Sequence, residues 1–386
     1  MVVNVVKLGD VATISAGQSA PKSNYFCEEG IPFVRAGSLE FLERGESIDL
    51  CEKISEDNAQ ICRLKLYPKN SILFAKSGMS ANKGRIYKLE RSAYIVSHLA
   101  IITPDETKLI PEYLMYWLQK HPPKTLIKDE SYPSIGLTDI ANMEIELPPL
   151  DKQKKIAKIL DKADEIRAKK KLANDKLDEF LKSTFITMFG NISNKTTLSQ
   201  YITTLSAGKS LAGEEECENK VLNTSSVTWD RFDKNQYKNY PLDYIPQEEH
   251  KVRIGDVIIS RMNTPALVGT VGYVWDVDDN IYLPDRLWKA NITDKVNPIF
   301  LWQLLIQPST KIEIQKIATG TSGSMKNISK EKILKLSVLD VAIEEQNKFA
   351  KIVEKVEAQK QKNELVIEQM NNLFNSLSQR AFKGEI

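Results

Sequence analysis

The sequence contains few of the residues from which metal sites and membrane spans are built. Among 386 residues there are 4 cysteines and 3 histidines, and the cysteines form no C-x-x-C pair. This scarcity argues against a zinc site. No apolar run approaches the roughly 20 residues that a transmembrane helix needs, and the N-terminus shows no signal-peptide pattern. We therefore expect a protein of the reducing cytoplasm.

A surplus of charge of either sign is also missing. The chain has 53 Lys and Arg residues against 51 Asp and Glu residues, for a net charge of +2. This balance neither requires nor excludes a nucleic-acid partner, because a basic binding face can coexist with an acidic surface elsewhere. A hydrophobic content of 42% in a chain of this length is enough for more than one core.

The motifs of an independent enzyme are lacking as well. Gly208, Lys209 and Ser210 resemble the end of a phosphate-binding loop, but Thr203 stands where that loop requires a glycine. No serine, cysteine or histidine lies in a recognisable nucleophile setting. We therefore expect no catalytic residue, no metal and no cofactor on this chain itself.

What the sequence does contain is an internal repeat at an offset of about 190 residues, far longer than a solenoid unit. The matched segments are, in order, 15–19 with 206–210, 70–76 with 255–261, 111–118 with 298–305, and 137–140 with 328–331. Their order is the same in both copies. The third pair starts with a proline and carries aromatic and leucine residues at helical spacing, which predicts two equivalent helices. The repeat therefore indicates two duplicated domains.

Each copy ends in a long charged segment, 151–189 and 343–382, without proline or glycine. Both segments are predicted to be long helices. Residues spaced by three and four form a narrow stripe, which is typical of a coiled-coil seam. The predicted seam includes Ile156, Ile159, Ile166, Lys170, Leu177 and Phe180 in the first segment, and Phe349, Ile352, Val356, Asn363, Val366, Met370 and Leu373 in the second. The two stripes are related by an offset of 193 residues.

Lys170 and Asn363 fall at the middle of their seams. In an antiparallel pair related by a pseudo-two-fold axis they would meet, and one buried polar layer is a known way to fix the register. Alternatively, both side chains point outward into solvent. Helices of roughly 35 residues at about 1.5 Å per residue would form a spacer of about 50 Å. Such a spacer exceeds one DNA turn of about 34–36 Å, which suits a split recognition site.

At Pro148 and Pro149, where a strand leads into the first long helix with Asp151 and Gln153, the sequence resembles the specificity subunits of Type I restriction-modification systems. The C-terminal segment 381–386 also resembles that family's ending. The resemblance covers the whole chain: one recognition domain, a helix, a second recognition domain and a second helix. The second copy departs from the pattern, because 338–343 lacks the two prolines.

The resemblance implies that each recognition domain reads one half of a bipartite, asymmetric DNA target while the helices set the gap between the halves. It also implies that the chain joins two methyltransferase subunits and, in the full complex, motor-nuclease subunits. The S-adenosylmethionine, ATP and magnesium would then bind to those partners rather than to this chain.

Candidate DNA contacts follow from chemistry, because base edges are read by forked donors and amides, while lysines and hydroxyls contact phosphates. Two polar segments recur in both copies, one after the apolar strand and one before the helical arm. The candidates are Lys76, Ser77, Asn82, Lys83, Arg85, Ser131, Tyr132 and Ser134 in the first copy, and Ser260, Arg261, Asn263, Thr321, Ser322, Ser324, Lys326 and Asn327 in the second.

The predicted fold is α+β: two similar target recognition domains with short strands at 71–75, 143–147 and 257–260, joined by an antiparallel coiled coil. The expected boundaries are 1–150 and 191–341 for the domains and 151–190 and 342–386 for the spacer helices. Two rival functions remain open. The chain could be a diverged DNA methyltransferase or nuclease, or a coiled-coil scaffold whose domains never touch DNA.

Overall fold

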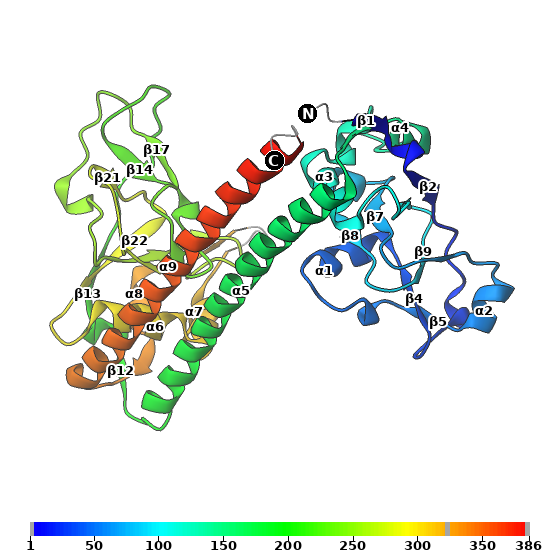
Figure 1. Cartoon of the computed structure of the whole chain (residues 1–386). Coiled ribbons are helices and arrows are strands. Elements are labelled where there is room, and N and C mark those ends of the chain that lie inside the picture. Colours follow the sequence, from blue (N-terminus) through cyan, green and yellow to red (C-terminus); the bar gives the residue numbers. More distant parts are fainter. Residues whose placement is uncertain (1–3, 321–324, 383–386) are drawn as a thin grey trace. The chain divides into compact units, whose positions relative to one another are not determined.

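The computed structural model describes residues 4–320 and 325–382, and the chain divides into two compact units. Unit 1 comprises Met1–Lys171 and Glu364–Ile386, and unit 2 comprises Leu172–Asn363. Each unit holds one globular domain and parts of both long helices, α5 (Leu150–Phe189) and α9 (Ile343–Phe382) (Figure 1). Among the described helices, none is long and apolar enough to cross a membrane.

Domain 1, the globular part of unit 1, mixes short strands with short helices. Its strands are β1 (Asn4–Lys7), β2 (Ala12–Ala16), β3 (Phe26–Cys27), β4 (Ile31–Val34), β5 (Lys53–Ile54), β6 (Leu66–Tyr67), β7 (Ile72–Ala75), β8 (Ile86–Lys88), β9 (Ala93–Ile95), β10 (Leu99–Pro104) and β11 (Glu144–Leu147). Its helices are α1 (Leu39–Glu43), α2 (Glu56–Ile61), α3 (Pro111–Lys120) and α4 (Leu137–Ala141).

Domain 2, the globular part of unit 2, has the same character. Its strands are β12 (Lys195–Thr197), β13 (Ile202–Ser206), β14 (Lys220–Leu222), β15 (Val227–Thr228), β16 (Arg231–Phe232), β17 (Tyr237–Asn239), β18 (Val257–Ser260), β19 (Met262–Asn263), β20 (Val271–Tyr273), β21 (Ile281–Tyr282), β22 (Leu287–Ile292), β23 (Lys326–Asn327) and β24 (Ser337–Leu339). Its helices are α6 (Pro298–Ile306), α7 (Pro308–Ile317) and α8 (Lys330–Leu334).

Each domain contains a four-stranded antiparallel sheet, and the order of the strands is the same in both. It is β2-β10-β7-β8 in domain 1 and β13-β22-β18-β20 in domain 2. A second pair of strands closes each domain next to its long helix, β1 with β11 and β12 with β24. The predicted internal repeat and the α+β class are therefore confirmed at the level of strand order.

The central strands β7 and β18 are buried at every position because both faces of the sheet are covered. On one face lie the Pro-led helices α3 and α6, whose first residue needs no backbone donor. In α6 the side chain of Asn297 also caps the helix, accepting from the amides of Ile299 and Phe300 at 2.9 and 3.3 Å.

Outside this common sheet the domains differ. Domain 1 adds a five-stranded sheet, β3-β5-β4-β9-β6, whereas domain 2 adds the three-stranded sheet β17-β14-β21 and the hairpin β15-β16. The common sheet is thus the shared scaffold, and the additions give each domain its own surface.

Each long helix is fastened to its domain by one buried glutamine at its start. Gln153 in α5 accepts from the amide of Ile110 at 2.8 Å and donates to the carbonyls of Lys108 and Pro148 at 2.9 and 2.8 Å. Neither Gln153 nor its counterpart in α9 has any solvent exposure.

The counterpart in α9 is Gln346, which makes the same three bonds. It accepts from the amide of Asn297 at 2.9 Å and donates to the carbonyls of Lys295 and Val341 at 3.0 and 2.7 Å. The missing prolines of the second copy therefore leave the attachment of its helix unchanged.

Within each unit, α5 and α9 run antiparallel. In unit 2, Asn174 contacts Asn363, while further along α5 Phe185 packs on Phe349, which lies earlier in α9. In unit 1, Arg167 contacts Asn371. The predicted antiparallel coiled coil is confirmed.

The seam prediction is wrong at three positions. Ile159 is 45% exposed, Phe180 49% and Leu373 43%. The neighbouring residues Leu160 and Leu181 are buried instead. The physical reason is that each helix also packs against the core of its own domain, which turns the buried stripe by one residue.

The other predicted seam residues lie inward to different degrees. Ile156, Phe349, Val356 and Asn363 are buried. The half-buried ones are Ile166, Lys170, Leu177, Ile352, Val366 and Met370. The predicted meeting of Lys170 with Asn363 joins residues of different units and stays a prediction. Within unit 2, Asn363 bonds Asn174.

Candidate nucleic-acid interface

The two polar segments predicted in domain 1 are brought together at the end of strand β7. The amide of Ile135 donates to the carbonyl of Lys76 at 2.8 Å. Ser77 and Ser134 form an antiparallel bridge. The hydroxyl of Ser77 also lies 2.9 Å from Nδ1 of His98. The segments 76–85 and 131–134 are called the paired loops of domain 1 below.

Domain 2 builds the same frame at the end of strand β18. The amide of Ile328 donates to the carbonyl of Arg261 at 2.9 Å. Met262 and Asn263 then pair with Asn327 and Lys326 as strands β19 and β23. The segments 260–264 and 325–327 are the paired loops of domain 2. The candidates Thr321, Ser322 and Ser324 lie outside the described residues.

The paired loops of domain 1 present polar side chains to solvent. Tyr132 is 82% exposed. Asn82, Lys83, Ser131 and Ser134 are also exposed, and Lys76 and Ser77 are half-buried. All of these remain candidates for contact with DNA.

Arg85 is different, because its guanidinium already has acidic partners. It bonds Glu40 at 3.0 Å and lies 3.4 Å from a carboxylate oxygen of Glu43, both on α1. The hydrogen bond and the charge of Arg85 lower the pKa of Glu40. A contact between Arg85 and DNA would therefore have to replace an existing ion pair, although the prediction is not tested.

In domain 2 one candidate fails. Ser260 has no solvent exposure, and its hydroxyl accepts a hydrogen bond from Nδ2 of the Asn263 side chain at 3.3 Å. The prediction that its side chain contacts DNA is wrong, because the residue is the last of a central strand covered on both faces. Its role is to position Asn263.

Arg261 is the first residue after strand β18. The central carbon of its guanidinium lies 5.6 Å from the centre of the Trp288 ring. This stacking orients the guanidinium at little entropic cost. Nε of Arg261 and Oδ1 of Asn327 are both buried, with no hydrogen-bond partner among the described residues. Buried polar atoms usually have a partner, and Arg261 and Asn327 therefore stay candidates for contact with DNA.

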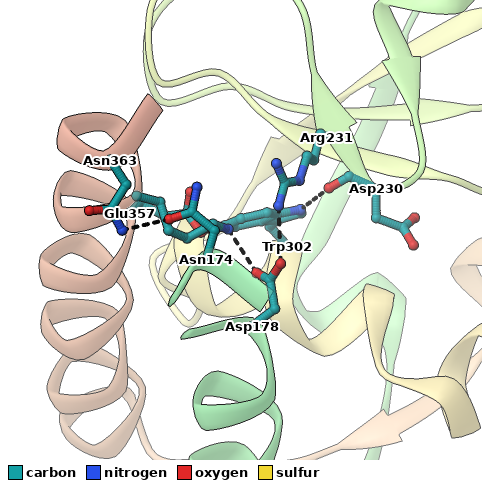
Figure 2. A network of polar contacts seen from close by, with 8 residues as sticks. Asn174, Asp178, Asp230, Arg231, Trp302, Glu357 and Asn363 are labelled. Carbon is teal, nitrogen blue, oxygen red and sulfur yellow. Dashed lines mark hydrogen bonds and ion pairs between the residues drawn. The ribbon is translucent and has the colours of Figure 1, made fainter. Parts of the chain in front are cut away.

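Sequence reasoning missed a charged layer between the helices of unit 2. Lys360 is 5% exposed and binds Asp178 of α5 at 2.7 Å and Glu357 at 2.8 Å. Arg231 of domain 2 binds the other oxygen of Asp178 at 3.1 Å. Figure 2 shows Asp178 between the helix α9 and this arginine, with the Asn174–Asn363 bond one turn away.

Unit 1 contains the equivalent layer. Arg167 pairs with Asp164 and donates to Asn371 at 2.9 Å. Arg167, Asp164 and Asn371 correspond to Lys360, Glu357 and Asp178 at the same offset of 193 residues that relates Leu150 to Ile343. The repeat could therefore have revealed both layers, had the charged residues been aligned along with the apolar ones.

Comparison with known proteins finds similarity to one family. A family model described as the Type I restriction modification DNA specificity domain matches residues 2–177. The MjaIX specificity subunit of Methanocaldococcus jannaschii is 33% identical over 150 residues, which span 38% of this chain and 34% of that protein. The EcoKI specificity subunit of Escherichia coli is 22% identical over 99% of this chain and 89% of its own length.

Solved structures share the fold. The S subunit of a Type I system from M. genitalium superposes with a TM-score of 0.59 at 14% identity, covering 98% of this chain and 96% of that one. A chain from a study of assembly and conformational transition in a Type I system gives a TM-score of 0.55 at 16% identity, over 99% and 98%. The family model, the relatives and the fold agree: residues 2–177 match the DNA specificity domain, and the chain as a whole resembles the specificity subunits of Type I restriction-modification systems.

Proposed function

We propose that this chain is the DNA-reading subunit of a Type I restriction-modification complex and that each domain contacts one half of a bipartite DNA sequence. The observation that carries the proposal is the duplicated frame of the paired loops. The hydrogen bond from Ile135 to Lys76 in domain 1 recurs in domain 2 as the hydrogen bond from Ile328 to Arg261. Both bonds lie at the same end of the equivalent sheet.

The differences between the domains support two distinct half-sites. Lys76 stands in the position of Arg261, and Ser134 in that of Asn327, relative to the shared bond. Asparagine forms two hydrogen bonds to the edge of adenine, whereas serine can contact more than one base, so that Asn327 and Ser134 would discriminate differently. The two domains would therefore read different sequences, and the target would be asymmetric.

The helices would bind the methyltransferase subunits. Leu172 and Leu365 are equivalent residues, and both are exposed, by 54% and 59%. Phe180 and Leu373, also equivalent, are both exposed. Two copies of one apolar surface on a duplicated chain suit two copies of one partner. The positions where the seam prediction fails would thus include the docking surface.

The chemistry would belong to these partners. We assign no catalytic residue to this chain, and the S-adenosylmethionine, ATP and magnesium would bind to the methyltransferase and motor-nuclease subunits. The complex would act in the cytoplasm, and the two long helices would fix the gap between the half-sites.

The proposal is tested by measuring retention of random-sequence duplex DNA by the chain in complex with its methyltransferase. We expect selective retention that weakens steeply with salt, because phosphate contacts release counterions. Arg261→Ala should weaken selection, whereas Arg253→Ala should not, because Arg253 precedes the opposite end of the same strand. Methyl transfer or cleavage by the chain alone would favour a diverged enzyme, and no retention at all would favour a protein scaffold.

A further inference from the structure

An unusual two-residue turn joins strands β15 and β16 in domain 2. Its residues, Trp229 and Asp230, have φ angles of 53° and 61°. Residues with a side chain rarely adopt this left-handed conformation, and turns of this kind normally use asparagine and glycine. A strained conformation of this kind persists only where the surrounding structure enforces it, and such residues are common at functional sites.

The surroundings enforce this turn through Asp230. Its carboxylate accepts from the amide of Val271 at 3.1 Å and pairs with Lys311 of α7. Its carbonyl accepts from Nε1 of Trp302 at 3.2 Å, as Figure 2 shows. Three elements of domain 2 therefore hold the turn.

A fourth contact ties the hairpin to a long helix. Arg231, the residue after the turn, binds Asp178 of α5 at 3.1 Å. Asp178 in turn holds the buried Lys360 of α9. The hairpin is thus fixed both to its own domain and to the helices of unit 2.

The anchored hairpin presents the side chain of Trp229 to solvent, where it is 72% exposed. The indole makes no hydrogen bond or ring contact with another residue in the described part of the chain. By contrast, Trp117, Trp288 and Trp302 are at most 5% exposed. A large aromatic side chain that a fixed backbone turn presents to water is typical of a binding contact, because the backbone loses little conformational entropy when a partner covers it.

The turn lies at the end of the sheet where strand β18 ends and Arg261 follows. The hydroxyl of Thr270 donates to the carbonyl of Val227, just before the turn, at 3.1 Å, and the amide of Ser260 donates to the carbonyl of Thr270 at 2.9 Å. In domain 1 the paired loops themselves carry a strongly exposed aromatic side chain, that of Tyr132. An exposed aromatic residue thus accompanies the paired loops in both domains.

We propose that Trp229 is an aromatic DNA contact of domain 2. The inference rests on the proposed function, and it adds a residue outside the paired loops. The indole would pack against a sugar or the face of a base in the groove, as apolar and aromatic wedges do in other DNA-binding proteins. Because the hairpin is anchored to α5, this contact would also tie the position of the duplex to the spacer helices.

The test uses tryptophan fluorescence of the full chain with its methyltransferase. Trp229 is the one strongly exposed tryptophan among the 5 of this chain, so the difference in acrylamide quenching between the wild-type and Trp229→Phe complexes reports on it. Random-sequence duplex DNA should protect this fluorescence, and the protected signal should vanish in Trp229→Phe. Trp229→Ala should weaken DNA binding about tenfold, the loss typical of one stacking aromatic side chain, while Trp229→Phe should keep most of the affinity.

Quenching that is unchanged when DNA binds would overturn the inference and leave the proposed function intact. Protection by the methyltransferase in the absence of DNA would overturn it too, because Trp229 would then be a protein contact. Failure of the wild-type chain to retain any duplex would instead reject the proposed function on which the inference rests.

Discussion

Asn363 of α9 donates a hydrogen bond to Asn174 of α5, from Nδ2 to Oδ1 over 2.7 Å, within the helix pair of unit 2. Asn363 is 2% exposed. A buried amide pair between two helices gives little net stability but penalises other registers, because a slipped helix would bury both amides without their partner.

Asn174→Leu should therefore destabilise unit 2 by about 1–3 kcal/mol, since Asn363 loses this acceptor in a buried position. Replacing both residues by leucine should restore most of the loss, because an apolar pair fits the seam. Urea unfolding, monitored by the circular dichroism signal of the helices, measures the stability of the single and the double variant. Equal and additive losses from the two substitutions would show that the pair is not coupled.

Gln153 and Gln346 each satisfy three backbone groups at a helix start. Gln346→Ala should cost about 2–4 kcal/mol, because three polar groups then lack their partner in a buried place. Hydrogen exchange should rise in unit 2 and not in unit 1. Gln153→Ala is the matched control and should give the opposite pattern; a rise in both units from either variant would contradict the assignment of each glutamine to its own unit.

The exposed leucines of the long helices can be tested by counting the methyltransferase subunits that the chain binds. Leu172→Lys or Leu365→Lys should remove one methyltransferase subunit from the complex, and the double variant should remove both, because each would place a charge in an apolar contact. Native mass spectrometry counts the bound subunits. Leu50→Lys, at a position 63% exposed in domain 1, serves as the control. A full complement of methyltransferase on the double variant would place the docking surface elsewhere.

The stability of unit 1 should depend on pH in the acidic range because of Glu112. Burial raises the pKa of this carboxyl, but the hydrogen bond and charge of Lys88 outweigh burial and leave the pKa below its usual value of 4.5. A lowered folded-state pKa contributes stability above the unfolded value that is lost as the pH falls through the folded one. Melting of Glu112→Gln should therefore depend less on pH below about 4.5 than melting of the wild type or of the exposed variant Glu130→Gln.

Much of the fold could be predicted from the sequence, because it depends on signals repeated in both copies. The Pro-led helices, the central strands and the long helices without proline or glycine appear in the structure as α3, α6, β7, β18, α5 and α9. Seam positions such as Phe180 were misassigned because a heptad pattern does not show that a helix also packs against its own domain.

The candidate site was only partly predictable. Loop composition indicated the two polar segments, but their meeting depends on a hydrogen bond between Ile135 and Lys76, which are far apart in the sequence. Trp229 carries no sequence signal, because its left-handed turn lacks the usual glycine and is enforced by contacts from other elements. Propensity cannot predict a conformation that tertiary contacts impose.

The central claim is that each domain reads one half of a split target, and binding-site selection with domain-specific variants tests it most directly. The wild-type complex should select two short motifs separated by a fixed gap. Arg261→Ala should alter one motif alone and Lys76→Ala the other, while Arg253→Ala and Lys69→Ala, before the opposite ends of strands β18 and β7, should alter neither. A single uninterrupted motif, or a change in both motifs from one substitution, would contradict the account.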